Sequence, residues 1–190
     1  MFNPKALIYP PFLIVLAALG LSCVHAPQQP PSVDVKVSPP LKQAKGYLSS
    51  GKYKKALDIY AAASDGHPED EDLLEAYADA LESVKAAADS AYEKQDYAKA
   101  GELYTLLARS ISEKKQLQGE LSFDDDHLAK RIKACSNKLM ELGIMKYRKG
   151  DLQQAIAIWK KILVFNPSDR EAKTSIDRAT AQMRNLEKIK

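Results

Sequence analysis

Three segments of the chain repeat one spacing of alanine and aromatic residues, and this repeat constrains the fold more than any other feature. The segments are SGKYKKALDIYAAASDGHPED, EKQDYAKAGELYTLLARSISEK and RKGDLQQAIAIWKKILVFNPSD. In each, a turn precedes an apolar residue, an alanine stands three residues later, and an aromatic ring follows four residues after the alanine. Alanine lets two antiparallel helices approach, and the ring fills the space one turn further along. The pattern therefore predicts three helical hairpins.

The rest of the chain after residue 40 has the same helical character. Apolar residues recur at spacings of three and four, which is the period of a helix with one buried face. Proline occurs only at Pro68 and Pro167 in this part, where it closes the first and third repeats. The only alternating strand-like pattern is the short Val33-Val35-Val37 run, which prolines isolate. We therefore expect an all-α protein.

The ordered set of repeated positions resembles the tetratricopeptide repeat, a pair of helices that stacks into a superhelix. The repeated alanines are Ala56, Ala100 and Ala155, and they lie 44 and 55 residues apart. The family's own period is about 34 residues, so the extra length has to lie between the units. The resemblance implies a solenoid of about three helix pairs across residues 41–190. Long first helices are expected at 71–94 and 126–149.

A closing helix is expected after Pro167. Ser168 can cap its first turn, and Glu171 stands three residues later, which completes a capping box. The helix should run to about Lys188 and cover the apolar face that the last repeat leaves exposed.

The first 40 residues have a different composition. An uninterrupted apolar run at 12–21 is about half of the roughly 20 residues that a membrane-spanning helix needs. Small residues, Gly20 and Ser22, stand just before Cys23, where a signal peptidase site would have them. The residues Leu19-Gly20-Leu21-Ser22-Cys23 resemble the lipobox of bacterial lipoproteins, although that family usually has leucine where Gly20 stands. An uncleaved membrane anchor or an ordinary secretory signal is the alternative interpretation.

The resemblance implies that residues 1–22 are a lipoprotein signal peptide. The thiol of Cys23 would take a diacylglyceryl group, and its new amino group a fatty acyl chain such as palmitate. Residues 23–40 are rich in proline and would form an extended tether for the domain at 41–190. Val24, rather than aspartate, follows the cysteine, which implies the periplasmic face of the outer membrane. In a host with a single membrane the anchor would lie in the cell membrane.

Composition and motifs give no support for catalysis, metal binding or nucleic-acid binding. The chain has 28 Lys and Arg residues against 25 Asp and Glu residues, so its net charge of +3 is too small to indicate a nucleic-acid partner. The acidic cluster SFDDDHL lacks the spacing of a calcium loop, and it fits the start of a helix, whose positive end favours carboxylates. Phosphate-binding, nucleophile-elbow and zinc-protease motifs do not occur. We expect a protein that is not an enzyme and that needs no cofactor other than the lipid on Cys23.

Cys135 stands at a helical spacing with Ile132 and Leu139, which is typical of a small buried apolar residue. Lipidation of Cys23 would leave it without an intramolecular partner. An intermolecular disulfide is the alternative, since the periplasm is oxidising.

Charge is distributed unevenly along the chain. Residues 128–190 carry 15 basic and six acidic residues, whereas residues 24–127 carry 12 basic and 19 acidic ones. A solvated helix surface accounts for this pattern. An acidic partner of the C-terminal repeat, or head-to-tail self-association, would account for it as well.

In tetratricopeptide proteins the first helices of successive units line a groove that binds a peptide or a helix. Alignment with that family implies ten groove residues: Leu41, Lys45, Leu48, Lys85, Asp89, Tyr92, Met140, Ile144, Tyr147 and Arg148. The expected function is a membrane-anchored adaptor or scaffold that binds other envelope proteins or peptides. The alternative is a structural subunit of an envelope, secretion or pilus assembly complex. Its own helices would then close the groove, and a long helix would expose an apolar stripe.

Overall fold

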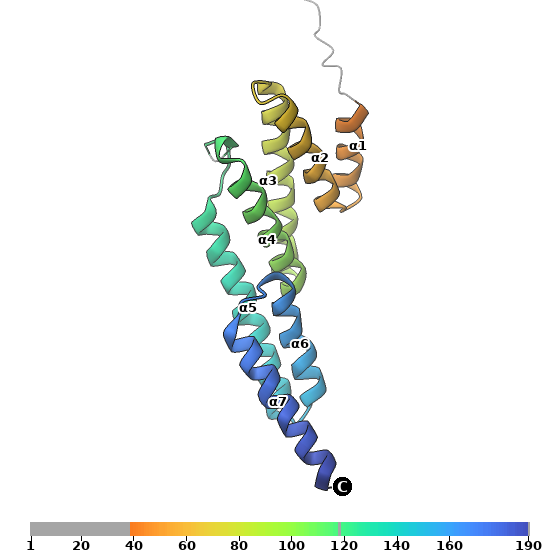
Figure 1. Ribbon diagram of the computed structural model, residues 1–190, viewed down its shortest axis with the longest axis vertical. Helices are drawn as coiled ribbons and strands as arrows, with labels where there is room; N and C mark the ends of the chain where they lie inside the picture. Colours follow the sequence, from red (N-terminus) through yellow and green to blue (C-terminus); the bar gives the residue numbers. More distant parts are fainter. Residues whose placement is uncertain (1–38, 118, 190) are drawn as a thin grey trace, which may run out of the picture. The chain divides into compact units, whose positions relative to one another are not determined.

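The computed structural model of the protein describes residues 39–117 and 119–189 (Figure 1). Their regular structure is entirely helical, which confirms the expected all-α class. The helices are α1 (Pro39–Ser49), α2 (Tyr53–Gly66), α3 (Glu71–Glu93), α4 (Tyr97–Glu113), α5 (Asp125–Arg148), α6 (Leu152–Phe165) and α7 (Arg170–Ile189), with a short 3-10 helix at Lys115–Leu117. The predicted signal peptide, the lipidation residue Cys23 and the tether as far as residue 38 lie outside the described residues.

The two helices expected to be long are the longest in the described part of the chain. The helix predicted at 71–94 is α3, and the helix predicted at 126–149 is α5, each displaced by no more than one residue at either end. Asp70 begins α3 by accepting a hydrogen bond from the backbone N–H of Leu73 at 3.0 Å. Asp124 begins α5 in the same way, at 2.7 Å from the N–H of His127. Both caps pair one of the backbone donors that the first turn of a helix leaves open.

One turn is built three times, between α1 and α2, between α3 and α4, and between α5 and α6. Its central residue has a positive φ in every case: 71° at Gly51, 62° at Gln95 and 84° at Gly150. The backbone N–H of the next residue bonds back to the carbonyl five residues earlier, at 2.8, 2.9 and 3.0 Å respectively. These bonds pair the last carbonyls of the first helix, as in a Schellman motif. The repeat seen in the sequence is therefore a repeated backbone structure.

A second turn is built twice, at His67-Pro68 before α3 and at Asn166-Pro167 before α7. In each, the residue before the proline bonds back to the preceding helix, at 3.1 and 2.8 Å. The predicted cap of the last helix is wrong in its residue. Asp169, rather than Ser168, accepts the N–H of Ala172, at 2.9 Å. The Ser168 hydroxyl instead donates to the Asn166 side chain, because the carboxylate one residue later lies at the true start of the helix.

The helices pack in chain order, each against the next. Contacts between alternate helices, chiefly α4 with α6 and to a lesser extent α1 with α3 and α2 with α4, join one hairpin to another. Two glycines permit the closest approaches: Gly101 on α4 lies against the ring of Phe165, and Gly143 on α5 lies against the indole of Trp159. A stacked pair of rings, Tyr60 on α2 and Tyr77 on α3, joins the first two hairpins with centroids 5.8 Å apart.

Helix α7 packs against α6 and buries Ala172 and Ala179 completely. Its remaining surface is mostly charged or polar. Cys135 is also fully buried and has a free thiol, which confirms the predicted core position. Among the described residues, no helix has both the length and the apolar character that crossing a membrane requires.

Candidate partner-binding site

The ten residues implied by the family resemblance lie in three separate environments. Those of the first hairpin are on α1, where Leu41 and Leu48 are half-buried against the core and Lys45 is exposed. None of the three lines a cavity described for this structure.

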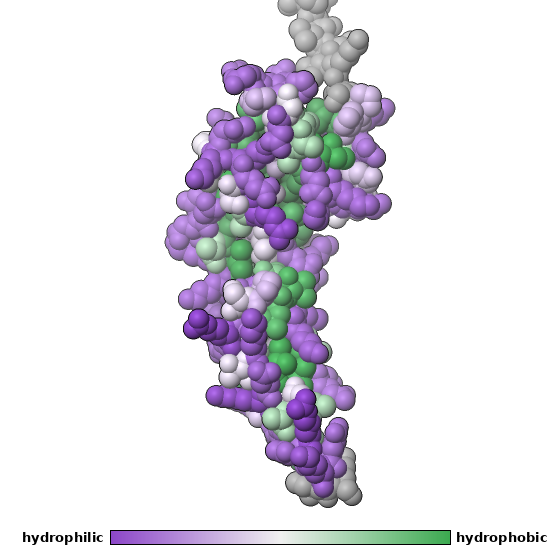
Figure 2. All heavy atoms as spheres, viewed as in Figure 1, coloured by the Kyte–Doolittle hydropathy of each residue, from purple (hydrophilic) through white to green (hydrophobic). Residues whose placement is uncertain are grey.

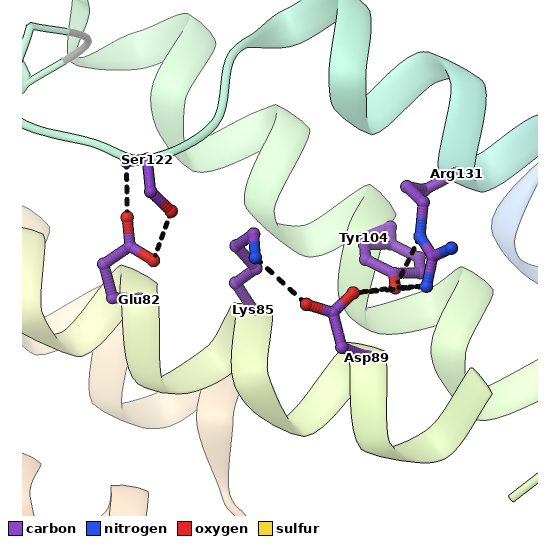
Figure 3. Close-up of polar contacts among 6 residues, drawn as sticks. All are labelled: Glu82, Lys85, Asp89, Tyr104, Ser122 and Arg131. Atoms are coloured by element: carbon purple, nitrogen blue, oxygen red, sulfur yellow. Dashed lines mark hydrogen bonds and ion pairs between the residues drawn. The ribbon is translucent and has the colours of Figure 1, made fainter. Parts of the chain in front are cut away.

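Two of the three residues on α3, Lys85 and Asp89, belong to a cluster of polar side chains shared with α4 and α5 (Figure 3), and the third, Tyr92, contacts the arginine of that cluster. Lys85 Nζ lies 3.0 Å from Asp89 Oδ2, one turn along α3. The hydroxyl of Tyr104, on α4, donates a hydrogen bond to Asp89 Oδ1. Arg131, on α5, donates to both partners, at 3.2 Å to Asp89 Oδ1 and 2.8 Å to the Tyr104 hydroxyl. Its guanidinium also lies over the ring of Tyr92, 4.2 Å from the centroid.

The electrostatics of this cluster favour a charged carboxylate. Burial alone would raise the pKa of Asp89, but hydrogen bonds from Tyr104 and Lys85 and the charges of Lys85 and Arg131 lower the pKa below its ordinary value. The pKa of Tyr104 is raised, first by burial and then by its bond to the Asp89 carboxylate. Tyr104 therefore stays a neutral donor. The cluster therefore links α3, α4 and α5 of the same chain.

A second contact closes the same side of α3. The connection that leads into α5 crosses near Glu82, whose carboxylate accepts hydrogen bonds from the backbone N–H and the hydroxyl of Ser122, at 2.6 and 2.9 Å (Figure 3). Of the α3 residues that the resemblance assigned to a groove, Asp89 and Tyr92 contact residues of other helices, and Lys85 contacts Asp89.

The residues on α5 lead to a different arrangement. Ile144 and Tyr147 line a cavity of about 530 Å³ that lies between α5 and α7 and over Trp159 of α6. We refer to it as the α5–α7 cavity. Met140 is buried and Arg148 is exposed, and neither lines the cavity.

The wall that α5 and α6 form is aromatic and held in place. The rings of Tyr147 and Trp159 lie 5.9 Å apart, and Trp159 Nε1 donates a hydrogen bond to the carbonyl of Met140 at 3.3 Å. The Trp159 ring is also fixed by its contact with Gly143. A rigid aromatic wall of this kind suits the burial of an apolar group.

The opposite wall belongs to α7 and is polar. Arg170, Thr174 and Arg178 follow each other at intervals of four residues and therefore share one helix face, beside Glu171 and Ser175. Within the described part of the chain, neither arginine side chain makes an ion pair or a hydrogen bond. Two unpaired guanidinium groups opposite an aromatic wall can bind a segment that offers an apolar side chain and a carboxylate.

Sequence reasoning did not identify the contribution of α6 and α7 to this cavity, nor that of Arg131 to the cluster. The four-residue spacing of Arg170, Thr174 and Arg178 was visible in the sequence. Only the packing of α7 against α6 shows that this face lines a cavity. No signal in the sequence indicates that Arg131 contacts Asp89, 42 residues away.

In residues 39–117 and 119–189, no group of histidine, cysteine, aspartate and glutamate side chains is arranged to hold a metal ion. A comparison with protein-family models found no match, and a comparison with curated proteins found none either.

Proposed function

We propose that the protein is a lipid-anchored adaptor of the bacterial cell envelope, built on tetratricopeptide-like hairpins, that binds a segment of another envelope protein. The α5–α7 cavity carries the proposal. Two residues that the resemblance assigns to a peptide-binding groove, Ile144 and Tyr147, line it together with Trp159 and two unpaired arginines. No catalytic residue is assigned.

The repeated turns at Gly51, Gln95 and Gly150, and the contacts between alternate helices, support the tetratricopeptide-like part of the proposal. The proposal of a lipid anchor is based on the sequence around Cys23. The proposed location of the anchored protein is the periplasmic face of the outer membrane. One acyl chain binds a membrane only marginally, whereas several chains on one cysteine anchor a protein stably.

Site-specific photocrosslinking in cells that make the full chain tests the adaptor function. A photoreactive phenylalanine analogue at Thr174, inside the cavity, should give an adduct with one partner protein. The same analogue at Gln182, on α7 but outside the cavity, is the matched control. We expect the Thr174 adduct to disappear when Arg178→Glu is added. No adduct at Thr174, or equal adducts at both positions, would reject the α5–α7 cavity as the binding site.

Globomycin, which inhibits the lipoprotein signal peptidase, tests the anchor separately. Treated cells should accumulate an uncleaved precursor, and untreated cells should contain a membrane-bound form whose mass corresponds to acylated Cys23. An unmodified Cys23 in the mature protein would reject the anchor without affecting the crosslinking result.

One observation favours the alternative of a structural subunit. Leu142 and Met145 lie one turn apart on the long helix α5, and 36% and 52% of their surfaces are exposed. If they form an interface between copies, the chain should self-associate in sedimentation velocity runs, and Met145→Ser should abolish that association. A monomer at every concentration would exclude self-assembly through this surface.

A further inference from the structure

A second cavity lies among α2, α4 and α6, where the start of α2 and the end of α6 meet the middle of α4. Its volume is about 610 Å³, and it shares no lining residue with the α5–α7 cavity. We refer to it as the α2–α4–α6 cavity. It forms on the even-numbered helices, whereas the groove implied by the family resemblance was assigned to α1, α3 and α5.

The floor of the α2–α4–α6 cavity is apolar and preorganised. Phe165 lines it, and a β-carbon on Gly101 would come within 2.7 Å of the Phe165 ring, so the ring fills the notch that this glycine leaves. The hydroxyl of Thr105 donates to the Phe165 carbonyl at 3.2 Å and holds the end of α6 on α4. Leu103 and Leu106 of α4 complete the floor. A partner would therefore meet a surface that needs little reordering on binding.

Val164 stands at the edge of this floor with 65% of its surface exposed. It is the most exposed of the large hydrophobic residues in the described part of the chain. Hydrophobic atoms also gather over α6 in the space-filling view (Figure 2). Apolar side chains that surround a cavity and continue onto the open surface are typical of an interaction site.

The rim of the cavity is basic. Lys52, Lys54, Lys55 and Arg109 surround it, and Glu102 is the only acidic residue that lines it. Lys54 is paired with Asp58 in solvent, at 2.7 Å, so the remaining cations dominate the rim. An acidic partner is attracted to such a rim and a basic partner is repelled.

We propose that the α2–α4–α6 cavity is a second docking site, and that its occupant is an acidic amphipathic helix of a partner protein. The regular structure of the described residues is helical throughout, and helices pair their backbone groups internally, so an extended segment would find no sheet edge to extend. A helix instead presents apolar side chains at one-turn spacing, which match a floor built from crossing helices. Its flanking carboxylates would then meet the lysines and Arg109.

A displayed library of amphipathic helical peptides tests the proposal. Each peptide carries leucines at one-turn spacing, and its flanking positions are randomised between glutamate and lysine. Selection on the purified protein should enrich acidic peptides. The enriched peptide, labelled with a fluorophore, then gives affinities by anisotropy. Val164→Glu should weaken binding by about tenfold or more, and Arg109→Glu by about threefold to tenfold.

The matched controls are Leu186→Glu and Arg184→Glu, two exposed substitutions of the same kinds on α7, and they should leave the affinity unchanged. Circular dichroism of each variant verifies that the fold is retained. Added salt should weaken the acidic peptide's binding, because the rim charges are exposed to solvent.

The proposal is overturned if the selection enriches no peptide, if enriched peptides show no acidic preference, or if Val164→Glu and Arg109→Glu bind as the wild type does. It is also overturned if the isolated chain forms a dimer that Val164→Glu abolishes, because the occupant would then be a second copy. None of these outcomes bears on the Thr174 crosslink.

Discussion

Gly143 of α5 lies directly against the indole of Trp159 on α6, and a β-carbon at residue 143 would overlap the ring nitrogen and its neighbours. The indole cannot move away freely, because its N–H is bonded to the Met140 carbonyl and its face lies near Tyr147. The closest approach within the third hairpin therefore requires glycine. This contact also sets the aromatic wall of the α5–α7 cavity.

Gly143→Ala should lower the free energy of unfolding by about 1–3 kcal/mol, the usual cost of overpacking a core. Gly46→Ala is the control, since residue 46 is an exposed position of α1 where a β-carbon meets no atom within 4 Å. It should raise the free energy of unfolding by about 0.5–1 kcal/mol, because alanine favours the helix. Urea unfolding followed by circular dichroism measures both. Equal effects of the two substitutions would contradict the contact.

Gln95→Gly should stabilise the protein by about 0.5–1 kcal/mol, since a left-handed residue with a side chain costs more than the added freedom of glycine. Gln95 has a φ of 62° at the position where the other two hairpins have glycine. The opposite sign is expected for Gln182→Gly inside helix α7, with a loss of about 1 kcal/mol. Urea unfolding compares the two variants. A loss of stability in Gln95→Gly would show that residue 95 does not hold the left-handed conformation.

Acid should remove the stabilisation that the Asp89 carboxylate contributes. The pKa of Asp89 is lowered in the folded chain, so this contribution is complete above the ordinary carboxyl pKa of about 3.9 and disappears as pH falls through the lower folded value. Asp89→Asn should therefore be destabilising near neutral pH, and its difference from the wild type should shrink in acid. Urea unfolding across the acid range measures this difference.

The same carboxylate depends on its partner on α5. In an Arg131→Met background, Asp89→Asn should lower the free energy of unfolding by less than it does in the wild type, because the ion pair between Asp89 and Arg131 has already been broken. A double-mutant cycle that gave no coupling would reject the cluster as a tie between α3 and α5.

Cys135 should react slowly with a thiol reagent in the folded protein. Burial raises the pKa of its thiol to about 11, so little thiolate is present at neutral pH and the sulfur is also inaccessible. In a Cys23→Ser background, labelling should require unfolding by urea and should then go to completion. Rapid labelling without denaturant would contradict the buried position.

Asp124→Ala should destabilise the protein by about 1 kcal/mol, because it removes the cap at the start of α5. Asp151→Ala is the matched control: Asp151 precedes α6 but its side chain makes no capping hydrogen bond. Thermal unfolding should show a clear decrease for the first variant and a smaller one for the second. Equal decreases would mean that the cap contributes little.

The helical hairpins were predictable because their signals are local. Alanine and aromatic residues at helical spacing, with glycine in two of three turns, are sufficient to predict α1 to α6, which include the two long helices α3 and α5. The residue that caps the last helix could also have been predicted from the sequence. Asp70 in HPED and Asp169 in NPSD occupy the same position of the same turn, and this comparison would have pointed to Asp169 rather than Ser168.

Tertiary structure alone decided which side chains meet. Asp89 and Arg131 are 42 residues apart in sequence, yet they share a hydrogen bond, because the long α3 and α5 bring them to the same level of the stack. Likewise, Val164 and Arg109 line one cavity only because the end of α6 returns to α4. The sequence by itself determined the class of the fold, its hairpins and their turns, since those depend on interactions within a few residues. The cluster and the two cavities depend on the angle at which whole helices cross, and that angle depends on many side chains acting together.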